Sequence, residues 1–260
     1  MNYGVVVGTQ RTGTTVLRSV LSTHPKLKTF GEVFLNRHSN MKESYYKYLQ
    51  MRLTNDVKLC VPSAENFGDL FKGYLEYLQD LSNEADCITF DCKYNFLQGA
   101  LIPGEMGMQK RPFLLHLFRE NEVKIIHLIR KDVLATYVSS LLSVKNQVWA
   151  TSDLSRLKAR SVEVPLENLV ENLRSRVAEQ EYFKALLPAK MVKTIFYEDM
   201  IIDGVFSEDV MDVVAEHLGV ENQFQLEPEL KKIAPSLQES IINFTQVKDL
   251  LKDTEFTLGN

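Results

Sequence analysis

The stretch from Tyr3 to Leu17 constrains the fold of this chain more than any other part of the sequence. Val5, Val6 and Val7 are consecutive β-branched residues, which favours a buried strand of a parallel sheet. Gly8 ends this strand, and the apolar residues after the loop are spaced as on one face of a helix. Such a strand, loop and helix bring unpaired backbone N–H groups and the positive end of a helix dipole to one point. The segment therefore predicts an anion-binding site.

The loop from Gly8 to Thr15 reads G-T-Q-R-T-G-T-T, which has the spacing of a phosphate-binding loop. Thr14 stands where such loops carry a lysine that contacts the β- and γ-phosphates, and this loss argues against triphosphate hydrolysis. Arg11 instead places a positive charge within the loop, which suits a 5′-phosphate or a phosphosulfate. The alternative is a strand-to-helix turn without a ligand. The residues expected to bind the ligand are Gln10, Arg11, Thr12, Gly13, Thr14 and Thr15.

Length and composition favour one α/β domain over residues 1–260, with no internal repeat or linker. The net charge of −4 argues against a nucleic-acid or anionic-membrane surface, so the anion site must be local. Three cysteines without a C-x-x-C pair favour a reducing compartment. The chain begins without a secretory pattern, and no apolar run approaches the roughly 20 residues of a membrane span. We therefore expect a cytoplasmic protein.

The rest of the sequence alternates between strand-like and helix-like segments. Strands are expected at 87–94, 123–129 and 192–196, and a short strand or an extended loop is expected at 27–34. Helical spacing is expected within 41–82, with breaks at Pro62 and Gly68, and over 133–144, 164–187, 205–218 and 230–251. The polar segment 149–160 is interpreted as a mobile loop or short helix over the site. This alternation favours a three-layer α/β/α fold around a central, mainly parallel sheet.

Two later strands end on cations. Lys93 ends one apolar strand and Arg130 ends another, and ligands of open α/β sheets gather at such carboxyl ends. Ser139 lies on the helix that follows Arg130, so this unit repeats the strand-to-helix anion geometry. The two units together predict two anion sites for one ligand. Glu32 lies among aromatic and apolar neighbours, where a carboxylate requires a partner or a function.

These residues resemble the sulfotransferases that use 3′-phosphoadenosine 5′-phosphosulfate (PAPS). The resemblance covers most of the chain and is carried by four segments. Arg11-Thr12-Gly13-Thr14-Thr15 is similar to the 5′-phosphosulfate loop, and Arg130 with Ser139 is similar to the 3′-phosphate motif. Tyr197-Glu198-Asp199-Met200 is similar to a strand end whose tyrosine would lie near the adenine. Gly31-Glu32-Val33-Phe34 is similar to a G-E-x-F segment of bacterial members.

Two departures separate the chain from the animal cytosolic branch. Val16 stands where that branch has a tryptophan that stacks on adenine, and Asn95 stands where it has a histidine base. Ser139 is also one residue further from Arg130 than in many members. The resemblance therefore points to the bacterial branch that modifies small molecules and glycolipids, in which a glutamate corresponding to Glu32 is the proposed base.

The resemblance implies transfer of a sulfuryl group from PAPS to a hydroxyl, less readily an amine, of a small-molecule acceptor. Arg11 and Lys93 would stabilise the charge of the transition state, and Glu32 would take the acceptor proton. Arg130, Ser139 and Tyr197 would bind the donor beside the loop, and no metal is required. The acidic net charge favours a neutral or cationic acceptor, and the resemblance to the bacterial members implies a polar natural product such as an alkaloid. The sequence does not indicate the oligomeric state.

Two other functions remain open from the sequence. A small-molecule kinase or nucleotide hydrolase of similar fold would use Asp91, which lies in an apolar strand, to bind magnesium. A non-catalytic nucleotide-binding protein would keep the loop without the chemistry. Thr14 in the lysine position counts against the first function, and the combination of Glu32, Lys93 and Arg130 counts against the second.

Overall fold

The chain forms a five-stranded parallel sheet in the order β2-β3-β1-β4-β5, as seen in a computed structural model. The structure describes residues 1–35, 40–99, 112–148, 158–227, 236–256 and 258. The strands are β1 (Asn2–Gly8), β2 (Leu27–Thr29), β3 (Cys87–Lys93), β4 (Lys124–Ile129) and β5 (Val192–Phe196). A separate hairpin joins β6 (Ile201–Ile202) and β7 (Val205–Phe206). The expected fold class, a three-layer α/β/α arrangement with a parallel sheet, is confirmed.

The central strand β1 pairs with β3 on one side and with β4 on the other. The register with β3 runs from Asn2 opposite Cys87 to Gly8 opposite Lys93. The register with β4 ends where Val7 lies opposite His127. All five strands point the same way, so the loop after Gly8, the side chain of Lys93 and the residues after β4 meet at one edge of the sheet.

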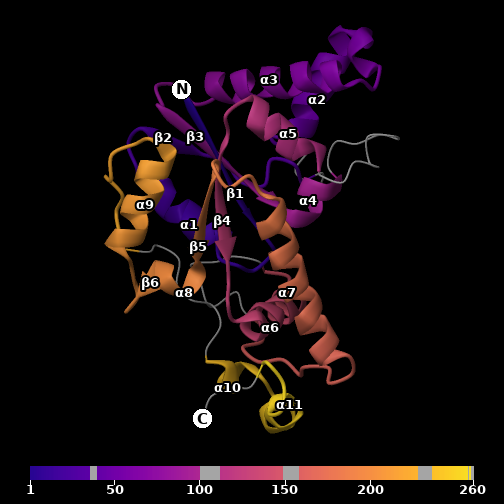
Figure 1. The fold of residues 1–260 in the computed structure, drawn as a ribbon, viewed down its shortest axis with the longest axis vertical. Coiled ribbons are helices and arrows are strands. Elements are labelled where there is room, and N and C mark those ends of the chain that lie inside the picture. The colour runs from indigo at the N-terminus through magenta and orange to yellow at the C-terminus, as the bar shows by residue number, and fades with distance from the viewer. Residues whose placement is uncertain (36–39, 100–111, 149–157, 228–235, 257, 259–260) are drawn as a thin grey trace.

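Helices cover both faces of the sheet (Figure 1). One face packs Val5, Val7 and Phe90 against α2 (Tyr45–Asn55), α3 (Ala64–Asp80), α5 (Phe113–Glu120) and α7 (Leu169–Leu186). The other face packs Val6 and Ile126 against α1 (Thr14–Leu21) and α9 (Glu208–Leu218). Because successive side chains of a strand point to opposite faces, the run of valines in β1 is buried on both sides.

A third apolar cluster joins the C-terminal helices to the rest of the chain. Val133 and Leu134 of α6 (Val133–Asn146) pack with Val247 and Leu251 of α11 (Phe244–Leu251). The preceding α10 (Leu237–Ser240) begins with a capping box. Figure 1 shows α10 and α11 beyond the carboxyl edge of the sheet, close to α6. Short elements complete the described chain: η2 (Val57–Cys60), α4 (Tyr94–Gly99) and α8 (Tyr197–Met200).

Several expected boundaries are wrong. Gly68 lies inside α3 and does not interrupt it, because a single glycine costs a helix only about 1 kcal/mol. The helix expected from residue 164 begins at Leu169, since Pro165 disfavours helical geometry in the residue before it. The helix expected from residue 205 begins at Glu208 because Val205 and Phe206 form a hairpin strand. The segment 27–34, expected as a short strand or an extended loop, forms β2 as far as Thr29.

Other expectations fall partly outside the described residues. These are the segment 149–160, of which 149–157 is not described, and the first part of 230–251, up to residue 235. Cys60 is exposed, unlike Cys87 and Cys92, which are buried as free thiols. Within the described ranges no helix is long and apolar enough to cross a membrane.

Candidate functional site

The loop between β1 and α1 has the backbone of an anion-binding loop. Arg11 (φ 70°) and Gly13 (φ 96°) both lie in the left-handed region. A side chain at Gly13 would collide with the ring of Tyr197, so glycine suits both the backbone and the packing here. No described side chain caps the N-terminus of α1, which starts at Thr14. The first N–H groups of this helix are therefore available to an anion.

Other loop residues contribute in different ways. The side chain of Thr12 is buried, and its hydroxyl donates a hydrogen bond of 2.9 Å to the carbonyl oxygen of Thr9. Thr12 therefore braces the loop with its side chain and offers only its backbone N–H to a ligand. Gln10 is exposed at the tip of the loop, and Thr15 is half-buried.

A chain of charged side chains lies behind this loop. Lys93 donates a short hydrogen bond to the hydroxyl of Thr14, and its Nζ lies 3.8 Å from Oε1 of Glu32. The same Nζ lies 3.9 Å from Oδ2 of Asp91, which in turn lies 3.4 Å from Nη1 of Arg18. Lys93 and Asp91 are buried, and Glu32 is half-buried. The structure thus brings the expected catalytic residues Glu32 and Lys93 together beside the loop.

Asp91 is the most deeply buried carboxylate of this chain of charges. Burial raises the pKa of Asp91 to about 6, although the nearby Lys93 and Arg18 act to lower it and Glu32 acts to raise it. Its Oδ2 faces both Arg18 and Lys93. A magnesium-dependent kinase would need this carboxylate to face the ligand, so its position argues against that alternative. Among the described residues no group of three or more His, Cys, Asp or Glu side chains is arranged to hold a metal ion.

The second predicted anion site lies next to the first. Nε of Arg11 donates a hydrogen bond of 3.0 Å to the hydroxyl of Ser139 on α6. The guanidinium of Arg130 lies 4.8 Å from the ring centroid of Tyr197, and its Nη1 reaches the carbonyl oxygen of Arg11 at 3.4 Å. The structure thus brings together Arg11, Ser139, Arg130 and Tyr197, which are far apart in the sequence.

One part of the expected geometry is wrong. The backbone N–H groups after β4 are not open to an anion, because those of Lys131 and Asp132 each donate 3.1 Å hydrogen bonds to the carboxylate of Glu198. Asp132 caps α6 by accepting a 2.7 Å hydrogen bond from the N–H of Ala135. The second site therefore consists of side chains, whereas the first also has backbone N–H groups.

The cations of this region suit an anionic ligand. Burial lowers the pKa of Arg11, and the positive charge of Arg130 lowers it further. The Nε of Arg130 is buried and has no acceptor among the described residues. An anion between these guanidinium groups would satisfy the unused donor and offset the repulsion. These residues therefore suit a ligand that carries two anionic groups.

The sequence did not predict the contacts of three further residues, although Asp91 was considered as a magnesium ligand. Arg18 lies one helical turn after Thr14, and this spacing is the signal that it shares a face with the loop hydroxyl. Asp91 precedes Lys93 by two residues on one strand, so both side chains lie on the same face. The capping role of Glu198 has no such local signal, because its partners are on another strand-to-helix connection.

The fold is a parallel α/β sheet with cations and open backbone N–H groups at the carboxyl ends of its strands, an arrangement that suits an anionic ligand. A family model described as the sulfotransferase family matches residues 5–224, which is most of the chain. The chain therefore belongs to the sulfotransferase family, whose common reaction is sulfuryl transfer.

Two solved structures were also compared with the chain. The sulfotransferase from Alicyclobacillus acidocaldarius is 14% identical, with a TM-score of 0.46, and the match covers 97% of this chain and 94% of that one. The mouse sulfotransferase SULT7A1, solved in complex with PAP, is 15% identical, with a TM-score of 0.42 and coverage of 85% and 59%. No curated protein matches the sequence significantly.

Proposed function

We propose that the protein transfers a sulfuryl group from PAPS to a hydroxyl of a small molecule. The observation that supports the proposal best is the meeting of Arg11, Ser139 and Arg130 beside an uncapped helix N-terminus. This arrangement gives two neighbouring anion sites, one at the loop and one at Arg130. A donor with phosphate groups at both its 5′ and 3′ positions would occupy both sites. Members of the family use such a donor, and the solved mouse sulfotransferase contains PAP, its product.

The donor-binding residues divide between the two strand ends. The 5′-phosphosulfate would be held by Arg11 and by the N–H groups of Gly13, Thr14 and Thr15, with Gln10 and Thr12 completing the loop. The 3′-phosphate would be held by Arg130 and Ser139. Tyr197 packs against the loop at Gly13 and lies under Arg130, a position that suits contact with the adenine.

When bound, the donor supplies a sulfuryl group joined to its 5′-phosphate through a bridging oxygen. Transfer forms a bond from sulfur to the acceptor oxygen and breaks the bond to the bridging oxygen, on which negative charge builds up. Arg11 and Lys93 would stabilise that charge. Glu32 would accept the proton of the acceptor hydroxyl, and Lys93 at 3.8 Å would hold the carboxylate in place.

The Gly31-Glu32-Val33-Phe34 segment supports the bacterial branch that modifies small molecules and glycolipids, including natural products. We also propose that residues 1–260 form one domain, which is supported by the apolar cluster between α6 and α11. The buried free thiols of Cys87 and Cys92 support a reducing, cytoplasmic location.

Thermal unfolding with ligands tests the choice of donor. PAP at a concentration well above its Kd should raise the Tm, because a ligand that binds only the folded state stabilises it. ATP with Mg²⁺ should give a smaller shift. A larger shift with ATP and Mg²⁺ than with PAP would favour a kinase, and no shift with either would refute the donor assignment.

Glu32→Gln tests the base. The substitution keeps the shape and removes basicity, so turnover should fall about 10²- to 10⁴-fold while PAP binding is unchanged. Glu216→Gln removes an exposed carboxylate of α9, outside the charged chain, and is the matched control. If Glu32→Gln folds, binds PAP and retains normal turnover, Glu32 is only a structural partner of Lys93.

A further inference from the structure

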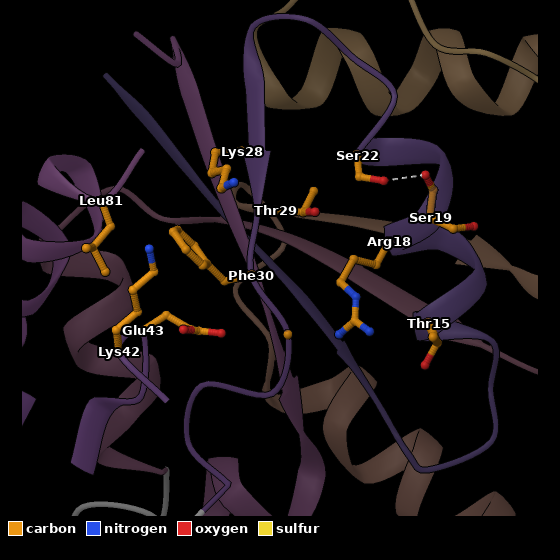
Figure 2. Close-up of a pocket in the computed structure, with 11 residues that line it drawn as sticks. Thr15, Arg18, Ser19, Ser22, Lys28, Thr29, Phe30, Lys42, Glu43 and Leu81 are labelled. Atoms are coloured by element: carbon orange, nitrogen blue, oxygen red, sulfur yellow. Dashed lines mark hydrogen bonds between the residues drawn. The ribbon is translucent and has the colours of Figure 1, made fainter. Parts of the chain in front are cut away.

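A pocket of about 450 Å³ opens beside the loop, between α1 and the segment that leads into α2 (Figure 2). A volume of this size is typical of sites for small organic ligands. Its floor consists of β2 and the residues that follow it. The lining residues are Thr15, Arg18, Ser19, Ser22, Lys28, Thr29, Phe30, Gly31, Lys42, Glu43 and Leu81.

The wall opposite α1 is held in place by α3. The hydroxyl of Tyr74 donates a 2.6 Å hydrogen bond to the carbonyl oxygen of Glu43, and that of Tyr77 donates one of equal length to the carbonyl oxygen of Lys42. Tyr74 is fully buried. These bonds fix the backbone from which the side chains of Lys42 and Glu43 project toward the pocket, as Figure 2 shows.

The lining is positively charged although the whole chain is acidic. The lining contains three cations, Arg18, Lys28 and Lys42, and one carboxylate, that of Glu43. In the described part of the chain neither Lys28 nor Lys42 forms an ion pair. Arg18 contacts Asp91 through Nη1, and its other guanidinium nitrogens have no acceptor among the described residues. The pocket therefore offers unused cationic donors to a ligand.

The pocket also adjoins the proposed reaction centre. Thr15 belongs to both the predicted phosphosulfate loop and the pocket lining. Arg18 lies against Gly31, where a side-chain carbon would come within 2.6 Å of its Nη1, and Gly31 precedes Glu32 in the chain. A molecule in the pocket would thus have one end near the loop and near Gly31, the residue that precedes Glu32, and the other end near the lysines.

We infer that this pocket binds the acceptor and that the acceptor is an anionic hydroxy compound, with a carboxylate or a phosphate held by Arg18, Lys28 and Lys42. The inference rests on the proposed sulfuryl transfer and names its substrate class. It differs from the expectation of a neutral or cationic acceptor, which came from net charge, and from that of an alkaloid, which came from the family resemblance. The charge that an acceptor meets is that of the pocket, and a cation would be repelled by three of its four charged side chains.

Calorimetric titration of the PAP-loaded protein with matched probes tests this inference. The probes are para-hydroxyphenylacetate, its neutral amide, the cation tyramine, glucose 6-phosphate and glucose. We expect the better of the two anions to bind about tenfold more tightly than its neutral counterpart, and tyramine to bind least. A larger preference for para-hydroxyphenylacetate over its amide indicates a carboxylate, and a larger preference for glucose 6-phosphate over glucose indicates a phosphate.

Charge reversal assigns the effect to the pocket. The double variant Lys28→Glu/Lys42→Glu should abolish the preference for anions and leave PAP affinity within about twofold. Lys72→Glu/Lys190→Glu makes the same charge change at exposed positions outside the pocket and should behave like the wild type.

The outcomes separate the two proposals. If PAP does not bind the wild-type protein, the proposed donor is wrong and this inference falls with it. If PAP binds but neither anion binds, or neutral or cationic probes bind as well as the anions, the inference alone is overturned. It is also overturned if the control variant loses the anion preference to the same degree as the pocket variant.

Discussion

The site contains two strand-to-helix junctions, a first from β1 to α1 and a second from β4 to α6. They share the same local design and differ in whether their backbone N–H groups are open to a ligand. After β1, the helix starts at Thr14 without a side-chain cap, and its first N–H groups are open. After β4, the N–H groups of Lys131 and Asp132 are bound to Glu198. A strand, a loop and a helix N-terminus therefore do not by themselves make an anion site. The deciding factor is whether a carboxylate of the protein already occupies the N–H groups.

The charges around the two junctions also differ in burial. Asp91 and Lys93 lie behind the first junction and are buried, with side chains 2% and 4% exposed. Lys131 and Asp199 form an ion pair at the second junction with more than half of each side chain exposed. Interactions between buried charges are screened less by solvent, so changes near the first junction should have the larger consequences.

The largest effect is expected for Arg11, which contributes to both junctions. Arg11→Met keeps much of the side-chain length and removes the charge, so turnover should fall about 10²- to 10³-fold, more than PAP affinity falls. Steady-state kinetics and PAP titration measure the two effects. Arg52→Met, on the exposed surface of α2, is the control. A loss confined to affinity would make Arg11 a binding residue and leave the catalytic role to Lys93.

The next effect is expected for Arg130, which follows β4 and reaches the first junction through the carbonyl oxygen of Arg11. Arg130→Ala should weaken PAP binding about 10- to 100-fold because a charge-assisted contact to the 3′-phosphate is lost. Binding of adenosine 5′-phosphosulfate, which lacks that phosphate, should change little. The neighbouring Lys131→Ala should affect neither ligand. Equal losses for both ligands would show that Arg130 does not read the 3′-phosphate.

The buried charges of the first junction should make stability depend on pH. The pKa of Asp91 is raised to about 6 in the folded protein. Between pH 4 and pH 6 the carboxyl group is therefore protonated in the folded protein and already ionised in the unfolded chain. The contribution of Asp91 to stability is therefore present at low pH and is lost as the pH rises through 6. Relative to Asp91→Asn, the wild type should lose on the order of 1–3 kcal/mol across this range.

Urea unfolding of both proteins at several pH values measures that difference. Lys131→Ala, which removes the exposed pair of the second junction, should show no comparable pH dependence relative to the wild type. A constant difference between the wild type and Asp91→Asn from pH 4 to pH 7 would contradict the raised pKa of Asp91.

The smallest effect is expected when Glu198 is removed. Glu198→Ala leaves the N–H groups of Lys131 and Asp132 without their acceptor, and should cost about 1 kcal/mol, or roughly 2–4 °C in Tm. The second junction would then resemble the first, so PAP should raise the Tm of the variant by at least as much as that of the wild type. A weaker response to PAP would mean that Glu198 positions Arg130 for binding.

The first junction could be predicted from sequence because its determinants are consecutive. The valines of β1, Gly8, Gly13 and the hydroxyls after it all lie within one short stretch. The strand ends at Lys93 and Arg130 could be predicted for the same local reason. Residue patterns place each of these side chains at the same edge of a parallel sheet, and this accounts for most of the site.

The remaining features depend on residues that meet only in the folded chain. Glu198 follows β5 and fills the junction after β4, which no pattern near either segment indicates. The charge of the pocket arises because Arg18, Lys28 and Lys42 converge from three segments, whereas composition indicated an acidic protein. Local sequence therefore predicts the elements and their ends, and tertiary contacts decide which groups stay open to a ligand.

The central place of β1 in the sheet also determines when the site forms during folding. Arg11 and Ser139 are 128 residues apart in the chain, and Lys93 and Thr14 are 79 apart. Closing loops of this length costs chain entropy before any contact repays it, and topologies with many such contacts fold slowly. Neither half of the chain contains a complete site. Binding of the proposed donor therefore reports completion of the whole sheet, and a nascent chain gains it only after β5 and the following Tyr197 have been added.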